Sequence, residues 1–154
     1  MARRLLLIST STVFGTRYLE HAFDELRDVL RGVKRVLFIP FALKDHAGYA
    51  AKARGAFEEI GFGLDSLHES RDAVRAIAGA EAIFCGGGNT FRLLDALYGL
   101  DALLPIRRRV EQGMPYAGAS AGSNLALFTT SRQATVPAML WPRGDWTTHW
   151  LTPP

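Results

Sequence analysis

Short apolar runs alternate with longer segments of helical periodicity between residues 4 and 126. The runs have the length and composition of buried strands and end in loop-forming residues. They predict strands over Arg4–Thr10, Arg35–Pro40, Gly63–Leu67, Ala82–Cys85 and Met114–Ala119. Apolar residues at helical spacing predict helices over Thr16–Leu30, Asp45–Ile60, Arg71–Ala78, Phe91–Tyr98 and Ala102–Gln112. This alternation predicts an α/β fold, in which a doubly wound, mostly parallel sheet carries helices on both faces.

The sequence Gly118-Ala119-Ser120-Ala121-Gly122 follows the last predicted strand and precedes a further helical start. The pattern Gly-x-Ser-x-Gly is typical of a nucleophile elbow, a sharp strand-to-helix turn with the serine at its tip. Glycine on each side removes side chains that would collide, and the following helix directs free N–H groups at the serine. The pentapeptide also occurs in ordinary loops. Its place at the carboxyl end of a parallel strand, where α/β proteins bind ligands, favours a catalytic Ser120.

A second glycine-rich stretch, Gly86-Gly87-Gly88-Asn89-Thr90, follows the fourth predicted strand. Glycines there let the backbone approach a ligand closely and turn its N–H groups inward. One use is an arm of an oxyanion hole, with the N–H of Ala121 as the other arm. A phosphate cradle is the weaker alternative, because no Gly-Lys-Ser/Thr follows and no Gly-x-Gly-x-x-Gly follows the first strand. A tight turn needing positive φ explains one glycine more easily than three.

The composition argues against several classes of protein. Cys85 is the only cysteine, which argues against a disulfide framework or a metal site of paired cysteines, and its apolar run predicts a buried strand thiol. The net charge of +3 is small, and Arg107-Arg108-Arg109 falls in a helical pattern that favours a solvated face. Leu5–Ile8 is too short for a signal peptide, and no apolar run is long enough to span a membrane. We therefore expect a cytoplasmic protein that binds neither nucleic acid nor membranes.

Three stretches of the chain match, in order and separation, the motifs of one known family. They are Phe38-Ile39-Pro40-Phe41-Ala42, Gly86-Gly87-Gly88-Asn89-Thr90-Phe91-x-Leu93-Leu94 and Gly118-x-Ser120-Ala121-Gly122-x-Asn124-Leu125-Ala126. With these motifs the chain resembles the peptidase E, or aspartyl dipeptidase, group of the S51 family of serine peptidases. The resemblance covers about residues 4–126.

The resemblance implies a glutamine-amidotransferase-like or flavodoxin-like α/β fold and a Ser-His-Glu/Asp peptidase. Such an enzyme removes N-terminal aspartate from short peptides through an acyl-enzyme, with a small peptide as its substrate and no metal or organic cofactor. By position, Ser120 is the nucleophile, and the N–H groups of Gly88 and Ala121 form the oxyanion hole. The residues implied to bind substrate are Gly87, Asn89 and Thr90.

The motifs that carry the resemblance end at Ala126, so we expect the C-terminal part of the family to be missing or divergent here. This divides the chain into an S51-like α/β domain, residues 1–126, and a divergent tail rich in tryptophan and proline, residues 127–154. The family's histidine, its acid and the arginine that reads the substrate aspartate lie in the part that is not matched. His149, the histidine that follows Ser120 in the chain, is the candidate base, with Asp145 as the candidate acid. His46 is the alternative base, whereas His21 and His68 are predicted to be structural or solvated.

Two alternatives to an aspartyl dipeptidase follow from these observations. A cyanophycinase-like enzyme, which cleaves an aspartate-arginine polymer, is the alternative within the family. A non-catalytic protein that keeps the fold and binds a small acidic ligand or a partner chain is the alternative outside the enzymes. Weak or absent activity is expected if no histidine reaches Ser120, since a serine hydroxyl is a poor nucleophile without a base. A sheet that lacks its later strands also exposes an edge, so we expect a homo-oligomer, a dimer in the simplest case.

Overall fold

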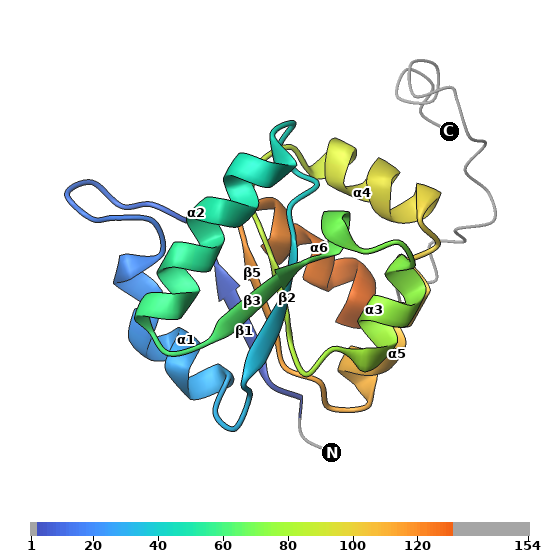
Figure 1. The fold of residues 1–154 in the computed structure, drawn as a ribbon, viewed down its shortest axis with the longest axis horizontal. Helices are drawn as coiled ribbons and strands as arrows, with labels where there is room; N and C mark the ends of the chain where they lie inside the picture. The colour runs from blue at the N-terminus through green and yellow to red at the C-terminus, as the bar shows by residue number, and fades with distance from the viewer. Residues whose placement is uncertain (1–2, 131–154) are drawn as a thin grey trace, which may run out of the picture.

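A parallel sheet of five strands forms the centre of the chain in the computed structural model, which describes residues 3–130 (Figure 1). The strands lie in the order β1-β5-β4-β2-β3, and every recorded pairing is parallel. Their bounds are Leu5–Ile8 for β1, Arg35–Ile39 for β2, Gly63–Ser66 for β3, Ile83–Cys85 for β4 and Tyr116–Ala119 for β5. Each lies inside or at the bounds predicted for it, so the predicted parallel sheet is confirmed.

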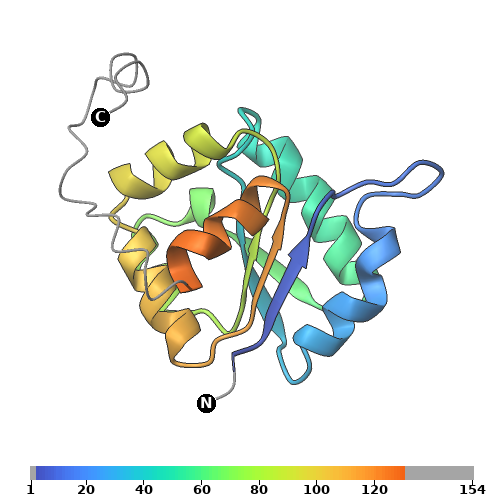
Figure 2. The ribbon, with the colours of Figure 1, turned by 180° about the vertical axis from the view of Figure 1, so that it is seen from behind.

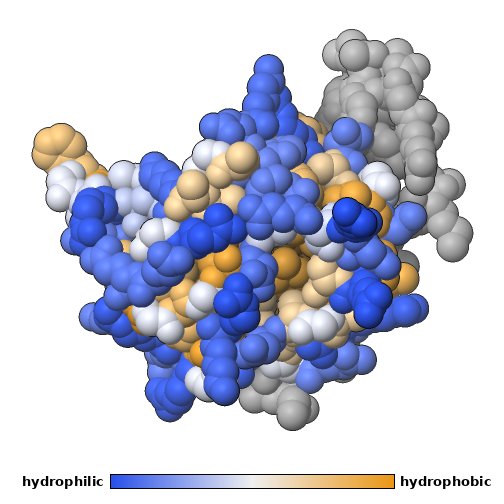
Figure 3. Space-filling view, viewed as in Figure 1, coloured by the Kyte–Doolittle hydropathy of each residue, from blue (hydrophilic) through white to orange (hydrophobic). Residues whose placement is uncertain are grey.

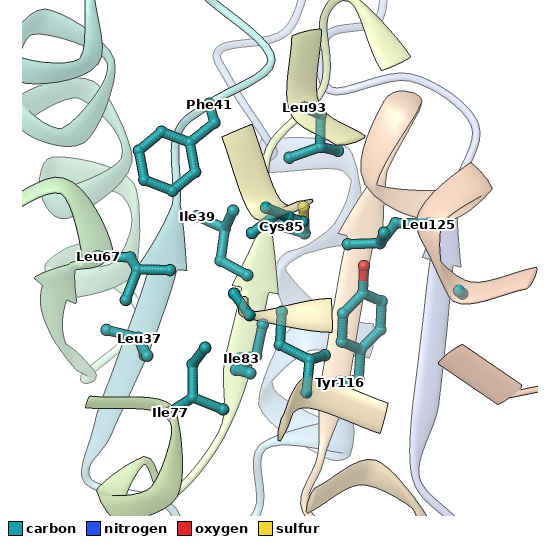
Figure 4. Packing of buried hydrophobic residues seen from close by; sticks show 14 of the residues in the cluster. Leu37, Ile39, Phe41, Leu67, Ile77, Ile83, Cys85, Leu93, Tyr116 and Leu125 are labelled. Atoms are coloured by element: carbon teal, nitrogen blue, oxygen red, sulfur yellow. The ribbon is translucent and has the colours of Figure 1, made fainter. Parts of the chain in front are cut away.

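Helices cover both faces of this sheet, as the alternation predicts. One face packs on α1 (Phe23–Val29) and α2 (His46–Glu59) through an apolar cluster that includes Phe38, Phe57 and Phe84. The other face packs on α3 to α6 through a second cluster that includes Ile39, Ile83 and Tyr116 (Figure 4). The bounds on this face are Ala73–Gly79 for α3, Thr90–Gly99 for α4, Leu103–Glu111 for α5 and Ala121–Thr130 for α6. The doubly wound arrangement is therefore confirmed.

Local signals in the sequence set the ends of α2 correctly. The Asp45 carboxylate accepts a hydrogen bond from the Gly48 N–H at 2.9 Å, which satisfies one of the free donors of the first turn. After the helix, Gly61 takes a φ of +92°, a conformation that glycine adopts without a Cβ penalty. Both residues act as the sequence predicted.

The first predicted helix begins later than expected. Leu19 is fully buried with a left-handed φ of 61°, and its N–H bonds the Ser11 carbonyl at 2.8 Å. The Thr16 hydroxyl bonds the Val13 carbonyl at 2.8 Å. These contacts hold the chain in a loop, so a short 3₁₀ turn, η1 (Glu20–Ala22), precedes α1. The helical spacing from Thr16 reflects burial of an irregular segment, and the predicted start there was wrong.

The two outer strands of the sheet are β1 and β3. Leu5 and Leu7 of β1 are 38% and 51% exposed, and Figure 2 shows β1 beyond β5 at the margin of the sheet. At the other edge, a pocket of about 700 Å³ lies between β3 and α3, with the Arg35–Asp65 ion pair in its lining. Figure 3 shows apolar surface among hydrophilic residues on the face where β3 and α3 lie.

No helix within residues 3–130 has both the length and the apolar character needed to cross a membrane.

Candidate active site

Ser120 stands at the tip of a strained turn between β5 and α6. Its φ is +50°, a left-handed value that is uncommon for a residue with a side chain, and its side chain is exposed. The Ser120 N–H donates to the Ile8 carbonyl at 2.8 Å, and the Ser120 carbonyl accepts from the Ser123 N–H at 2.8 Å. These bonds fix the backbone on both sides of the residue. The geometry is that of a nucleophile elbow.

The two glycines of the elbow are required by packing. A Cβ on Gly118 would lie 2.4 Å from the Gly122 carbonyl oxygen, and a Cβ on Gly122 would lie 2.1 Å from the Cys85 carbonyl oxygen. Both contacts are with backbone, which has little room to move. The start of α6 therefore rests directly on the ends of β5 and β4. The Tyr116 hydroxyl, buried below α6, adds a 2.6 Å hydrogen bond to the Gly122 carbonyl.

The glycine loop between β4 and α4 lies against this elbow. A Cβ on Gly87 would lie 2.9 Å from the Ser120 Cβ, so the two segments are in van der Waals contact. Gly88 has a φ of +138°, and its Cβ would lie 2.5 Å from the Ala42 carbonyl oxygen. The Asn89 N–H bonds the same carbonyl at 2.9 Å. The loop is thus held between Ser120 and the segment that follows β2.

Two backbone amides near Ser120 have no acceptor among residues 3–130. The N–H groups of Gly88 and Ala121 make no hydrogen bond with any part of the chain that the structure describes. The first comes from the glycine loop and the second from the first residue of α6. Amides of this kind can receive the negative charge that develops on a carbonyl oxygen under nucleophilic attack. The arrangement is therefore chemically suited to acyl transfer.

An open pocket of about 480 Å³ adjoins Ser120, and its lining residues are Leu7, Ser9, Ser120, Ser123 and Asn124. Sequence reasoning did not assign Leu7 or Ser9, because only the order of the strands brings the end of β1 beside β5. It also did not assign Ser123, which lies in the first turn of α6. Asn124 was part of the quoted motif, and its side chain donates to the Thr90 hydroxyl at 3.2 Å.

Two of the residues expected to bind substrate already make structural bonds. Asn89 caps α4, since its side-chain oxygen accepts from the Arg92 N–H at 2.9 Å. Thr90 accepts the bond from Asn124, which ties α4 to α6. Both residues border the loop that carries Gly88. Their contribution to substrate binding stays a prediction.

The histidines within residues 3–130 do not lie with Ser120. The His46 ring packs against Phe41 and His68 at centroid distances of 5.1 and 5.8 Å, beyond the ends of β2 and β3. The His68 Nδ1 is 2.6 Å from the hydroxyl of buried Ser66. Strands are spaced by about 4.8 Å, so β2 lies on the order of 10 Å from β5. The alternative of His46 as the base is therefore not supported.

His21 is exposed in η1, whereas His149 and Asp145 lie outside the described residues. Cys85 is fully buried, and burial raises the pKa of its thiol to about 12, so this thiol is neither accessible nor ionised at neutral pH. Within residues 3–130, no cluster of three or more metal-binding side chains is present.

Comparison with known proteins places these features in one family. The model of Peptidase family S51 matches residues 5–140. A Drosophila melanogaster protein named "Probable alpha-aspartyl dipeptidase" is 49% identical over 128 residues, which are 81% of this chain and 53% of the relative. Peptidase E of Streptomyces coelicolor is 45% identical over 122 residues, or 79% of this chain and 50% of the relative. The chain spans about half the length of these curated relatives.

Solved structures show the same likeness. A crystal structure of a Listeria monocytogenes EGD-e protein, named "Putative Peptidase E Protein", superposes with a TM-score of 0.61 and 25% identity. The match covers 78% of this chain and 59% of that one. A peptidase from an acI-B1 actinobacterium gives a TM-score of 0.58 at 20% identity, which shows a shared fold.

Proposed function

Because the chain belongs to peptidase family S51, we propose that it acts as a serine peptidase on short peptides with an N-terminal aspartate. The observation that carries the proposal is Ser120 at a left-handed turn, near the N–H groups of Gly88 and Ala121, which have no acceptor among residues 3–130. The preference for aspartate is taken from the names of its relatives, one of which is called an alpha-aspartyl dipeptidase.

The proposed reaction proceeds in two steps. The Ser120 oxygen attacks the scissile carbonyl carbon while a base takes its proton, and the amides of Gly88 and Ala121 hold the oxyanion. The peptide C–N bond then breaks, and the base returns the proton to the departing amine. The base then takes a proton from water, which attacks the ester carbon, and it returns that proton to the Ser120 oxygen as aspartate leaves. We assign the base to His149 and its acid to Asp145, both outside the described residues.

Labelling with a fluorophosphonate tests whether Ser120 is activated. We expect one phosphonate group per chain by intact mass, mapped to the peptide that contains Ser120. The Ser70→Ala variant removes an exposed serine far from the elbow and should label at the same rate, whereas His149→Ala should label far more slowly. Unlabelled protein would then be screened for hydrolysis of aspartyl dipeptides.

The alternative function is a non-catalytic binding protein. It is favoured by one observation: within residues 3–130, no imidazole is hydrogen-bonded to Ser120. A folded sample that resists the fluorophosphonate at every concentration would contradict the peptidase proposal and support this one. Binding measurements would then identify the ligand of the pocket beside Ser120.

We also propose that two copies pair through β1, in the cytoplasm. In an antiparallel pair centred on Leu6, Leu5 of one copy lies opposite Leu7 of the other, and the four leucines cover one another. Sedimentation velocity should show a dimer that dissociates on dilution. Leu7→Lys should weaken it tenfold or more, since burying a leucine contributes about 1.5–3 kcal/mol. A monomer at all concentrations would disprove the pairing.

A further inference from the structure

A tyrosine on α2 contacts the glycine loop from inside the protein. Tyr49 is 7% exposed, and its ring packs edge-on against Phe38 at 5.0 Å between centroids. Its hydroxyl donates a hydrogen bond of 3.2 Å to the Gly87 carbonyl. The hydroxyl thus reaches the carbonyl on the far side of the peptide unit that carries the Gly88 N–H.

We infer that Tyr49 is a positioning residue that aims the Gly88 N–H at the oxyanion. A trans peptide unit is planar, so the carbonyl of Gly87 and the N–H of Gly88 point in opposite directions. With the Gly87 carbonyl held by Tyr49 in the interior, the Gly88 N–H is directed away from the core, toward the open end of the sheet that holds Ser120. The catalytic part of this inference rests on the proposed function.

The other described hydrogen bonds of the glycine loop do not hold the peptide unit between Gly87 and Gly88, whereas the bond from Tyr49 does. The Gly86 N–H bonds the Ile39 carbonyl at 3.1 Å, and the Asn89 N–H bonds the Ala42 carbonyl at 2.9 Å. These bonds fix the two ends of the loop and contact neither atom of the peptide unit between Gly87 and Gly88. A glycine pair can rotate such a unit readily, because it lacks the Cβ atoms that restrict φ and ψ.

Gly86 has a distinct part in this arrangement. A Cβ at Gly86 would lie 2.5 Å from the Tyr49 hydroxyl oxygen, so any other residue would displace the tyrosine. The three consecutive glycines therefore each meet a different neighbour. Gly86 admits Tyr49, Gly87 admits Ser120, and Gly88 admits the Ala42 carbonyl.

A second tyrosine supports the first. The Tyr18 hydroxyl donates to the Tyr49 hydroxyl at 3.4 Å, and the two rings meet edge to face at 6.0 Å. Burial raises the pKa of both hydroxyls above the usual value, so both remain protonated and able to donate at neutral pH. The order Tyr18 to Tyr49 to Gly87 is a chain of donors in which each bond polarises the next.

The experiment compares the full chain with Tyr49→Phe, which removes only the hydroxyl. Tyr98→Phe on α4 is the matched control, since Tyr98 is half-buried on the opposite face of the sheet. The first measurement is the amide resonance of Gly88 in a ¹H–¹⁵N correlation spectrum. We expect Tyr49→Phe to shift or broaden it strongly and Tyr98→Phe to leave it in place. An unchanged Gly88 resonance in folded Tyr49→Phe would overturn the inference.

The second measurement is the rate of fluorophosphonate labelling at Ser120 as a function of probe concentration. We expect Tyr49→Phe to lower the limiting rate by about tenfold or more, because a misdirected oxyanion donor loses much of its effect. The probe concentration that gives half of this rate should not change, whereas a general loss of structure would alter both. Equal limiting rates for the two proteins would also overturn the inference.

Two further outcomes separate this inference from the proposed function. If the parent chain does not label but Tyr49→Phe moves the Gly88 resonance, the peptidase proposal fails and the positioning of the loop stands. If Tyr49→Phe does not fold, Tyr18→Phe takes its place. Loss of the second donor should then shift the Gly88 resonance by a smaller amount, and no shift would count against the donor chain.

Discussion

Replacing Ser120 with glycine is expected to abolish labelling and to make the protein more stable. The hydroxyl is the proposed nucleophile, so the rate of fluorophosphonate labelling should fall at least about 1,000-fold. The backbone at this position has a φ of +50°, which glycine adopts without the penalty paid by serine. We expect the free energy of unfolding to rise by about 1 kcal/mol, measured by urea denaturation.

Ser120→Ala is the matched control for this substitution. It removes the same hydroxyl but keeps a Cβ in the left-handed conformation, so labelling should be lost with no gain in stability. If the glycine variant were less stable than the alanine variant, the backbone at Ser120 would not be strained, and the turn would not be an elbow of this type. Opposite signs for activity and stability at one residue are expected where a strained site serves a function.

Gly122→Ala is expected to destabilise the protein by about 3 kcal/mol or more. The added methyl group would lie 2.1 Å from the Cys85 carbonyl oxygen, and β4 is held between β5 and β2. β4 therefore cannot move away from the added methyl group without losing hydrogen bonds to β5 or β2. Thermal or urea denaturation, followed by circular dichroism, measures the effect.

A second glycine provides the control. Gly55 lies exposed within α2, and a Cβ there would meet no atom within 4 Å. Gly55→Ala should therefore stabilise the protein by about 0.5–1 kcal/mol, because alanine is the better helix former. Equal effects of the two substitutions would show that α6 does not rest on β4 as the structure describes.

Much of the fold could be predicted because its signals are local. The run Arg35–Pro40 is apolar at nearly every position, which indicates a strand buried on both faces, and β2 is such a strand. The elbow at Ser120 could be predicted for the same reason, since two glycines at fixed spacing leave few other backbone paths. The start of the first helix could not, because the contacts of Leu19 that hold the loop are made by residues outside any periodic pattern.

The rest of the site depends on contacts between distant segments. Leu7 and Ser9 reach the pocket because β1 pairs with β5, and nothing in either run specifies its neighbour in the sheet. Tyr49 lies at an apolar helical position and reads as an ordinary core residue. Its hydroxyl acquires a role only when the ends of β2 and β4 are brought together. His46 begins a helix at the end of the sheet that holds Ser120, which made it a candidate base. In the structure it packs toward β3 instead.

Because the glycine loop packs directly on the elbow, the groups proposed to stabilise negative charge lie within one continuous part of the chain. Both proposed amide donors and the proposed nucleophile come from the segment between Gly88 and Ala121, and Tyr49 of α2 bonds the Gly87 carbonyl next to it. Charge stabilisation and proton transfer would then reside in separable stretches of polypeptide. Boronic acids, which form tetrahedral adducts with serine, would measure the affinity that Ser120 and the two amides give together.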